Sequence, residues 1–236
     1  MKKILLALGL LVTITGVSAK PDVPLPQNRV VEIARDNTHR VLMVKRNQER
    51  LTKRWAFVID SSHSTWSIAA KVITAFHTAT GFPSDQLRYC AYVFNDPGWT
   101  FKHYRSWVDA SPEEFEKTAK WIEDTKGVGS VAAPALFRAL RQPVRELTVI
   151  IISDGGFSDG GGRGGEGLST VEKIIEEGQK WRVKKGYGKA VICSIGLENT
   201  LCWPRYPKYN DNYCQQGMQA LGTEGLGGYF YVQRLK

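Results

Sequence analysis

The sequence predicts an α/β domain built on a mostly parallel β-sheet. Short apolar runs alternate along the chain with segments whose apolar residues recur at helical spacing, as in strands joined by helices. The run ELTVIIISD at 146–154 is apolar without interruption, as expected for a central parallel strand buried on both faces. The composition, with 42% hydrophobic and 23% charged residues, is that of a globular protein.

The first residues have the pattern of a secretory signal. Lys2 and Lys3 precede an apolar run at 4–17, and Ser18 and Ala19 supply small residues for cleavage. The run is shorter than the about 20 residues that a membrane span needs, although an uncleaved anchor is the alternative. We therefore expect 1–19 to be a signal peptide and the protein to be secreted, periplasmic or at the cell surface. No later segment is long and apolar enough to span a bilayer.

A basic leader is expected to follow at 20–53, ahead of the domain at 54–236. Residues 20–28 contain three prolines and are expected to be extended. In the basic segment 29–54, apolar residues fall near one helical face and favour a helix, although VLMV at 41–44 could equally be a strand. The residues on that face are Val30, Ala34, Val41, Val44 and Leu51.

The first half of the domain alternates between strands and helices. An apolar strand is predicted at 54–60, and a helix at 64–80 is ended by Gly81. A second strand follows at 86–94. The turn sequence NDPG then favours a hairpin, which makes 100–107 an antiparallel edge strand.

Capping signals define the helices of the second half. Ser111 caps a helix with Pro112 at its first position and Glu114 three residues after the cap. Ser169 and Glu172 form a capping box for a helix that extends to about Trp181. The remaining predicted elements are helices at 131–142 and 211–222 and strands at 146–154, 189–197 and 227–235.

The four cysteines fall into two classes. Cys90 and Cys193 lie within apolar, strand-like segments and are expected to be buried thiols. Cys202 and Cys214 flank WPRYPKYNDNY, a loop-forming sequence, and we expect a disulfide between them. It would stabilise the fold by about 3 kcal/mol on a chain-entropy argument. Sequence leaves the other pairings of four cysteines open.

Two aspartates end predicted strands. Asp60 ends the first strand of the domain and Asp154 ends the most apolar one, so both are expected at the sheet edge where α/β proteins bind ligands. Neighbouring carboxylates raise each other's pKa unless a cation lies between them. Ser62 and Ser64 follow Asp60 at spacings of two and four. Such hard oxygen ligands suit Mg²⁺ or Mn²⁺, although either serine could merely cap the following helix.

These residues resemble the metal-ion-dependent adhesion site of von Willebrand factor type A (vWA) domains. That family follows the Asp-x-Ser-x-Ser motif with a threonine after a glycine-rich turn and an aspartate in a strand-ending (S/T)-D-G. In this chain GVGSVAAPAL has Ser130 at the threonine position, and IIISDGG has Asp154 at the last. The resemblance extends over 54–236 and includes the terminal GTEGLGGYFYV. Three features depart from it: the serine at 130, His63 where a small residue is common, and the long glycine loop at 155–167.

The resemblance implies a doubly wound, Rossmann-like sheet of six strands flanked by helices, with one antiparallel edge strand. In that strand order two strands separate Cys90 from Cys193, about 14 Å apart, so they are not bonded to each other. It also implies that the ion recruits an Asp or Glu carboxylate of a protein partner. The implied ligands of Mg²⁺ or Mn²⁺ are Asp60, Ser62, Ser64, Ser130 and Asp154.

Two other functions are alternatives to a metal-dependent binding module. A metal-dependent phosphoryl hydrolase would place a second acid two residues after the strand-end aspartate, where this chain has Ser62. A serine hydrolase would show Gly-x-Ser-x-Gly, but Val128 and Ala132 flank Ser130. We therefore expect no enzymatic activity. A polyanion could bind the basic segment 29–54, although a solvated charged helix that packs on the domain is the preferred interpretation of that segment.

Other side chains near the motifs favour ordinary roles. The net charge of +9 favours acidic partners in general but does not predict nucleic-acid binding. His63 is expected to face solvent, and GGGRGG lacks the Gly-Lys-Ser/Thr ending of a phosphate-binding loop, which indicates a flexible segment. The tryptophans Trp66, Trp99 and Trp107 could border a binding face but are more often packing residues.

We predict that Lys20 is the mature N-terminus of an exported protein. N-terminal sequencing of the protein recovered outside the cytoplasm should read Lys-Pro-Asp-Val. Recovery of an intact Met1 in the cytoplasm would contradict the signal-peptide assignment.

Overall fold

The protein is built around an eight-stranded β-sheet. The computed structural model describes residues 30–35, 39–44, 52–63, 65–80, 86–95, 104–158, 167–197 and 211–234. The strand order is β1-β2-β8-β7-β6-β3-β4-β5. The strands from β8 to β4 pair in parallel, whereas every pairing that involves β5, β2 or β1 is antiparallel. The predicted α/β class is confirmed, but the predicted number of six strands is wrong. The strands are β1 (Val30–Arg35), β2 (His39–Val44), β3 (Arg54–Asp60), β4 (Arg88–Phe94), β5 (Tyr104–Asp109), β6 (Leu147–Ser153), β7 (Val191–Leu197) and β8 (Leu226–Arg234).

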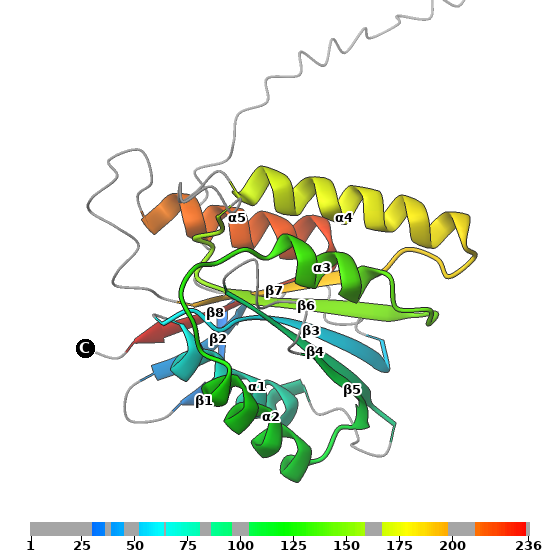
Figure 1. The fold of residues 1–236 in the computed structure, drawn as a ribbon. Helices are drawn as coiled ribbons and strands as arrows, with labels where there is room; N and C mark the ends of the chain where they lie inside the picture. Colours follow the sequence, from blue (N-terminus) through cyan, green and yellow to red (C-terminus); the bar gives the residue numbers. More distant parts are fainter. Residues whose placement is uncertain are drawn as a thin grey trace, which may run out of the picture.

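Helices cover both faces of the sheet (Figure 1). Successive residues of the central strands point to opposite faces, so Phe57 and Ile150 join the core beneath α1 and α2, and Val58 and Ile151 join the core beneath α3 and its neighbours. No helix of the described chain is long and apolar enough to cross a membrane. One face carries α1 (Trp66–Thr80) and α2 (Pro112–Asp124), and the other carries α3 (Ala133–Leu140), α4 (Gly167–Lys184) and α5 (Asp211–Glu224).

The order of the parallel strands reverses beside β3. The chain leaves β3 through α1 to reach β4 on one side, and it later enters β6 on the other side. The carboxyl ends of β3 and β6 are therefore neighbours at a topological switch point, which is where open α/β sheets bind ligands. Asp60 ends β3, and Asp154 directly follows β6.

The helix expected in the basic segment 29–54 is wrong. This segment instead contains the hairpin β1–β2, and the alternative that 41–44 is a strand is confirmed. β2 pairs antiparallel with β8, from Met43 opposite Phe230 to His39 opposite Arg234. Without β2, β8 would present a row of unpaired backbone groups, and pairing satisfies them. Because the partner strand lies at the other end of the chain, local residue spacing could not reveal this preference.

The helix starts agree in part with the capping signals. Ser111 caps α2 as predicted, since its Oγ accepts a hydrogen bond of 3.2 Å from the backbone N–H of Glu114. The capping box at Ser169 is wrong, because α4 begins two residues earlier at Gly167. Leu168, in the first turn of α4, packs against the core of that face, which places the first turn ahead of Ser169.

The two strand cysteines are buried free thiols, as predicted. β3 and β6 lie between the strands that carry Cys90 and Cys193, and the two side chains belong to core clusters on opposite faces of the sheet. Burial raises the pKa of both thiols, so they stay protonated. The predicted Cys202–Cys214 bond falls outside the side chains that the structure describes and remains a prediction.

A fully buried arginine ties the ends of α3 and α4 to two loops. Arg182, in the last turn of α4, is 0% exposed. Its guanidinium donates hydrogen bonds to the carbonyl oxygens of Leu140 (3.3 Å), Gln142 (3.0 Å), Val144 (2.6 Å) and Gly188 (3.1 Å). Burial lowers its pKa. The charge is accommodated by peptide carbonyls that converge from both loops.

We predict that Arg182→Met destabilises the fold by about 3–5 kcal/mol, because it leaves buried carbonyl oxygens without donors. The free energy of unfolding should be measured by urea denaturation. Lys185→Met, which removes an exposed cation three residues away, is the matched control and should change stability by less than about 0.5 kcal/mol. A similarly small effect at Arg182 would contradict this role.

Candidate metal centre

Asp60 is a fully buried carboxylate held by fixed donors at the end of β3. Its Oδ1 accepts hydrogen bonds from the backbone N–H of Ser62 (3.0 Å) and from Thr65 Oγ1 (3.0 Å). Its Oδ2 accepts a hydrogen bond from Ser153 Oγ (2.8 Å). Both carboxylate oxygens therefore have a defined orientation toward the carboxyl edge of the sheet.

A hydroxyl-bearing turn connects β3 to α1. The carbonyl oxygen of Ser62 accepts hydrogen bonds from the backbone N–H groups of Thr65 (3.0 Å) and Trp66 (3.1 Å), which closes the turn. The hydroxyl oxygens of Ser62 and Thr65 are 2.9 Å apart and share a hydrogen bond. Both residues are buried. His63 between them is exposed, as expected, and Ser64 lies outside the described residues.

Asp154 lies next to Asp60 across the switch point. The parallel register pairs Ile59 with Ile152, which brings the end of β3 beside Ser153 and Asp154. The Asp154 side chain is only slightly exposed, and its Oδ1 accepts a hydrogen bond of 2.8 Å from the backbone N–H of Gly156. The turn after β6 thus directs this carboxylate back to the sheet edge.

The two carboxylates are electrostatically crowded. Burial, and secondly the charge of Asp154, raise the pKa of Asp60 to about 7, although hydrogen bonds from Ser62 and Ser153 oppose the shift. Two ionised carboxylates at this depth repel each other and lack hydration. A divalent cation with oxygen ligands would relieve both costs, so the residues present fit Mg²⁺ or Mn²⁺.

The loop that carries Ser130 is fastened to the same edge. It leads from α2 on one face of the sheet to α3 on the other, and Gly127 forms a parallel bridge with Ser62. The backbone N–H of Val131 donates to the carbonyl of Asn95 (2.9 Å), and that of Ser158 donates to the carbonyl of Ser130 (3.0 Å). Ser130 is therefore held between the end of β4 and the turn that follows β6.

Asn95 organises this loop from beneath, and sequence reasoning missed it. Its Nδ2 donates hydrogen bonds to Ser61 Oγ (3.1 Å) and to the carbonyl oxygen of Thr125 (2.9 Å). A Cβ at Gly127 would lie 2.6 Å from this Nδ2, so only glycine fits there. Gly129 has φ of 94°, which also favours glycine. The signal in the sequence is the position of Asn95 directly after the strand predicted at 86–94. The turn sequence NDPG accounts for Asn95 in another way and so hides this role.

Thr65 and Ser153 were also missed, although both contact Asp60 directly. Thr65 lies in the same hydroxyl-rich run as Ser62, five residues after Asp60. Ser153 precedes Asp154, and only the pairing of β3 with β6 shows that it faces Asp60. Trp66 and Trp107 pack against the core, which agrees with the packing interpretation, and Trp99 lies outside the described residues.

The structure thus brings Asp60, Ser62 and Asp154 together and fastens the loop of Ser130 to the same edge. No cluster of three or more His, Cys, Asp or Glu side chains suited to a metal occurs within the described ranges. The candidate centre is of another kind, with two carboxylates and several hydroxyls. An open groove of about 990 Å³ lies elsewhere, between α4, the end of α5 and the start of β7.

Neither a search against models of protein families nor a comparison with curated proteins finds a match to this chain. The function must therefore be argued from the residues of the site.

We predict that, in the metal-free protein, the ionised carboxylate of Asp60 lowers the free energy of unfolding, so that its effect on stability depends on pH. Because the pKa of about 7 in the folded protein exceeds the ordinary aspartate value of 3.8, folding favours the protonated carboxyl. Its stabilising contribution is complete below about pH 4 and is lost as the pH rises through 7. With a chelator present, Asp60→Asn should gain stability relative to wild type between these pH values, by at most about 4 kcal/mol.

Melting curves of both proteins from pH 4 to 8 measure this difference. Asp124→Asn, which alters an exposed carboxylate at the end of α2, reports what the loss of one surface charge does by itself. A stability difference between Asp60→Asn and wild type that does not change with pH would contradict the shifted pKa.

Proposed function

We propose that this protein is a metal-dependent protein-binding module of the vWA type, exported from the cytoplasm. Its metal would be Mg²⁺ or Mn²⁺, and its partner a protein that presents an Asp or Glu carboxylate. The proposed ligands are Asp60, Ser62, Ser64, Ser130 and Asp154, with the two aspartates contributing directly or through a bound water. Export rests on the signal-like first 19 residues alone.

The observation that carries this proposal is the crowding of Asp60 and Asp154 at the switch point. Burial and mutual repulsion raise the pKa of Asp60 to about 7, which is unfavourable without a counter-charge. The groups that hydrogen-bond to Asp60 are hydroxyls and a backbone N–H, all of them neutral. A cation bound between the two carboxylates would attract both of them and so offset their mutual repulsion.

The chemistry of the surrounding residues favours binding over catalysis. Serine hydroxyls are neutral, so two carboxylates would leave a bound divalent ion with a net positive charge and the ability to accept a further carboxylate. Thr65 and Ser153 orient Asp60 through hydrogen bonds to its two oxygens. The position two residues after Asp60, where phosphoryl hydrolases of similar fold carry a general acid, is Ser62, which cannot serve as one at neutral pH.

The N-terminal hairpin is an addition to the six-stranded arrangement that the resemblance implies. Its strands β1 and β2 extend the sheet beyond β8 and bring the total to eight strands. The hairpin joins the edge farthest from β4 and β5, so it leaves the switch point between β3 and β6 unchanged.

We predict that Asp60→Ala abolishes Mg²⁺ binding while the fold persists. Removing one of two crowded carboxylates relieves repulsion, which offsets the loss of an acceptor for Ser62, Thr65 and Ser153, so metal-free stability should hold or rise. Ser130→Ala should weaken Mg²⁺ binding only roughly tenfold, because water can replace one neutral ligand. Calorimetric titration with Mg²⁺ and metal-free melting curves measure these effects.

Ser106→Ala is the matched control, since Ser106 is an exposed serine on β5. A second experiment tests the partner: wild type and Asp60→Ala should be used to capture proteins from the native cell surface, in Mg²⁺ and in chelator. Capture that requires both Mg²⁺ and Asp60 supports the proposal. If wild type binds no divalent cation, even with captured partner present, the residues around Asp60 serve only the turn and helix start.

A further inference from the structure

The ends of α3 and α4 form a basic corner on the edge of the sheet opposite the candidate metal centre. α3 ends at Leu140, and its following loop leads into β6, whereas α4 ends at Lys184 and its following loop leads into β7. Since β6 and β7 are parallel neighbours, both loops lie at the amino-terminal edge of the sheet. Five exposed cations occupy these helix ends and loops: Arg141, Arg145, Lys184, Lys185 and Lys189.

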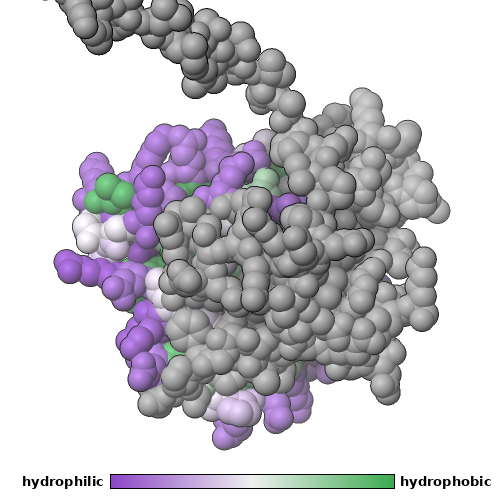
Figure 2. Space-filling view, turned by 180° about the vertical axis from the view of Figure 1, so that it is seen from behind, coloured by the Kyte–Doolittle hydropathy of each residue, from purple (hydrophilic) through white to green (hydrophobic). Residues whose placement is uncertain are grey.

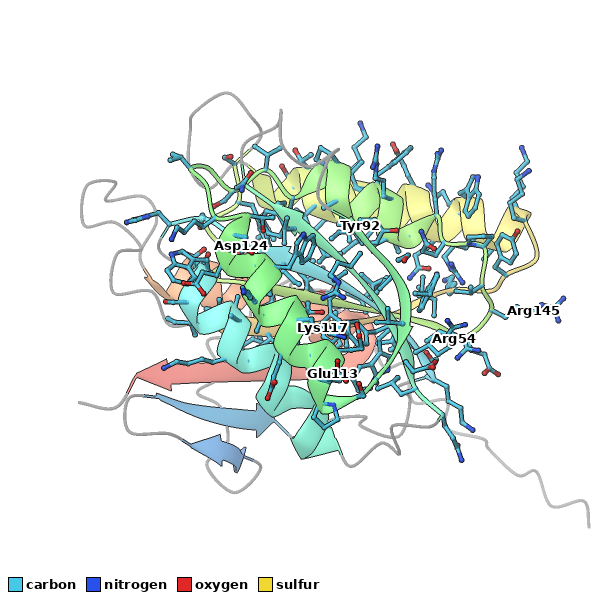
Figure 3. The ribbon with its side chains drawn as sticks, turned by 60° about the horizontal axis from the view of Figure 1, so that its bottom comes forward. Arg54, Tyr92, Glu113, Lys117, Asp124 and Arg145 are labelled. Atoms are coloured by element: carbon cyan, nitrogen blue, oxygen red, sulfur yellow. The ribbon has the colours of Figure 1, made fainter. Side chains whose placement is uncertain are left out.

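Only one acidic residue, Glu146, lies within the two loops that form the basic corner, and it is exposed. None of the five cations forms an ion pair with another residue of the described chain, whereas Lys117 and Lys180 elsewhere on the surface do. Figure 3 shows that Arg145 projects at one end of the molecule, with Arg54 beside it, and that Asp124 lies at the other end. The two loops therefore carry more cations than acids, although Lys184 and Lys189 also line the groove with Glu172, Glu176 and Glu224.

The corner also exposes apolar side chains. Phe137 on α3 is 38% exposed and Val183 on α4 is 54% exposed, which makes them two of three large apolar side chains exposed to this degree in the described chain. Trp181 and Tyr187 are half-buried, with ring centroids 5.8 Å apart, and the guanidinium of Arg141 connects Phe137 with Trp181. Seen from behind, the end of the molecule where α4 terminates is mostly hydrophilic with small hydrophobic areas (Figure 2).

The corner is rigid because the buried Arg182 joins its two loops. Hydrogen bonds from its guanidinium reach the carbonyl oxygens of Gln142 and Val144 in one loop and of Gly188 in the other. The two loops and the ends of α3 and α4 are thus held in fixed positions relative to one another, with Phe137, Arg141 and Trp181 in contact on the α3 side and Val183 on the side of the groove toward α5. Lysines at the end of α4 also complement the helix dipole, but that effect explains neither the loop cations nor the exposed Phe137 and Val183.

We propose that the basic corner docks on an anionic phospholipid surface. Lysine and arginine side chains near such a surface each contribute about 1 kcal/mol, and Trp, Tyr and other apolar side chains enter the boundary between headgroups and acyl chains. In this orientation the edge with Asp60 and Asp154 faces away from the membrane. The inference does not depend on the proposed metal-binding function.

The arrangement of the aromatic rings argues against a nucleic acid as the occupant. Single-stranded nucleic acids stack bases on free ring faces. Here the guanidinium of Arg141 lies over the ring of Phe137 (3.8 Å to the centroid) and near that of Trp181 (5.5 Å). Because Arg141 already occupies one face of each ring, these rings offer less free face for base stacking, whereas their apolar surface still suits a lipid interface.

Co-sedimentation of the purified protein with vesicles tests this proposal. A chelator is present, so that no divalent cation can connect the protein to the phospholipid headgroups. Vesicles of phosphatidylcholine with about one third phosphatidylglycerol should bind the protein, and pure phosphatidylcholine should not. Binding should weaken strongly between about 0.1 M and 0.5 M salt. Lys184→Glu combined with Lys185→Glu should weaken binding by at least about 20-fold.

Two matched controls distinguish an effect of the basic corner from an effect of net charge or of exposed apolar side chains elsewhere on the protein. Lys120→Glu combined with Lys173→Glu reverses two exposed lysines outside the corner and should have a much smaller effect. Phe137→Ser should weaken binding roughly fivefold, whereas Val128→Ser, at an exposed apolar residue on the loop of Ser130, should not.

Three results would overturn the proposal: no binding to the anionic vesicles, equal losses in the two lysine pairs, or binding only to a soluble polyanion such as heparin. Because all these measurements are made without metal, they stand or fall separately from the adhesion-site proposal.

Discussion

Two aspartates brought together at the ends of the central strands determine how this end of the molecule is built. β3 and β6 are paired in a register that brings Asp60 beside Ser153 and Asp154. Burial and repulsion then make ionisation of both carboxylates unfavourable. Nearly every polar contact at this edge supplies Asp60 with a donor or holds a loop beside it, which is the arrangement expected of a site that accepts a cation.

The side chains around Asp60 form a hydrogen-bonded network that also holds the neighbouring helix and loop. Thr65 donates to Asp60, and its carbonyl oxygen accepts hydrogen bonds from Ile68 and Ala69 in the first turn of α1, so the same residue serves the site and the helix. Asn95 donates to Ser61 Oγ and to the carbonyl of Thr125, and it packs so closely on Gly127 that no side chain fits there. The loop that changes face between α2 and α3 is therefore positioned by the ends of β3 and β4, which its own glycine at 127 lets it approach closely.

The two edges of the sheet have opposite chemistry. The carboxyl edge concentrates buried carboxylates and hydroxyls, whereas the amino edge near α3 and α4 exposes cations with apolar side chains among them. Arg182 has at one edge the role that Asn95 has at the other, since each connects separate segments through side-chain hydrogen bonds. A protein held by its basic corner would direct the candidate metal centre outward.

Local sequence determined the parallel core, because uninterrupted apolar runs and helical spacing are properties of neighbouring residues. It also identified Asp60, Ser62 and Asp154 through their places at strand ends, the buried cysteines, and the cap at Ser111. Tertiary structure alone decided that 30–44 forms strands, since β2 gains its stability by pairing with β8 at the far end of the chain. It likewise decided the contacts of Ser153 and Asn95 with the site, because each depends on which strands become neighbours and in which register.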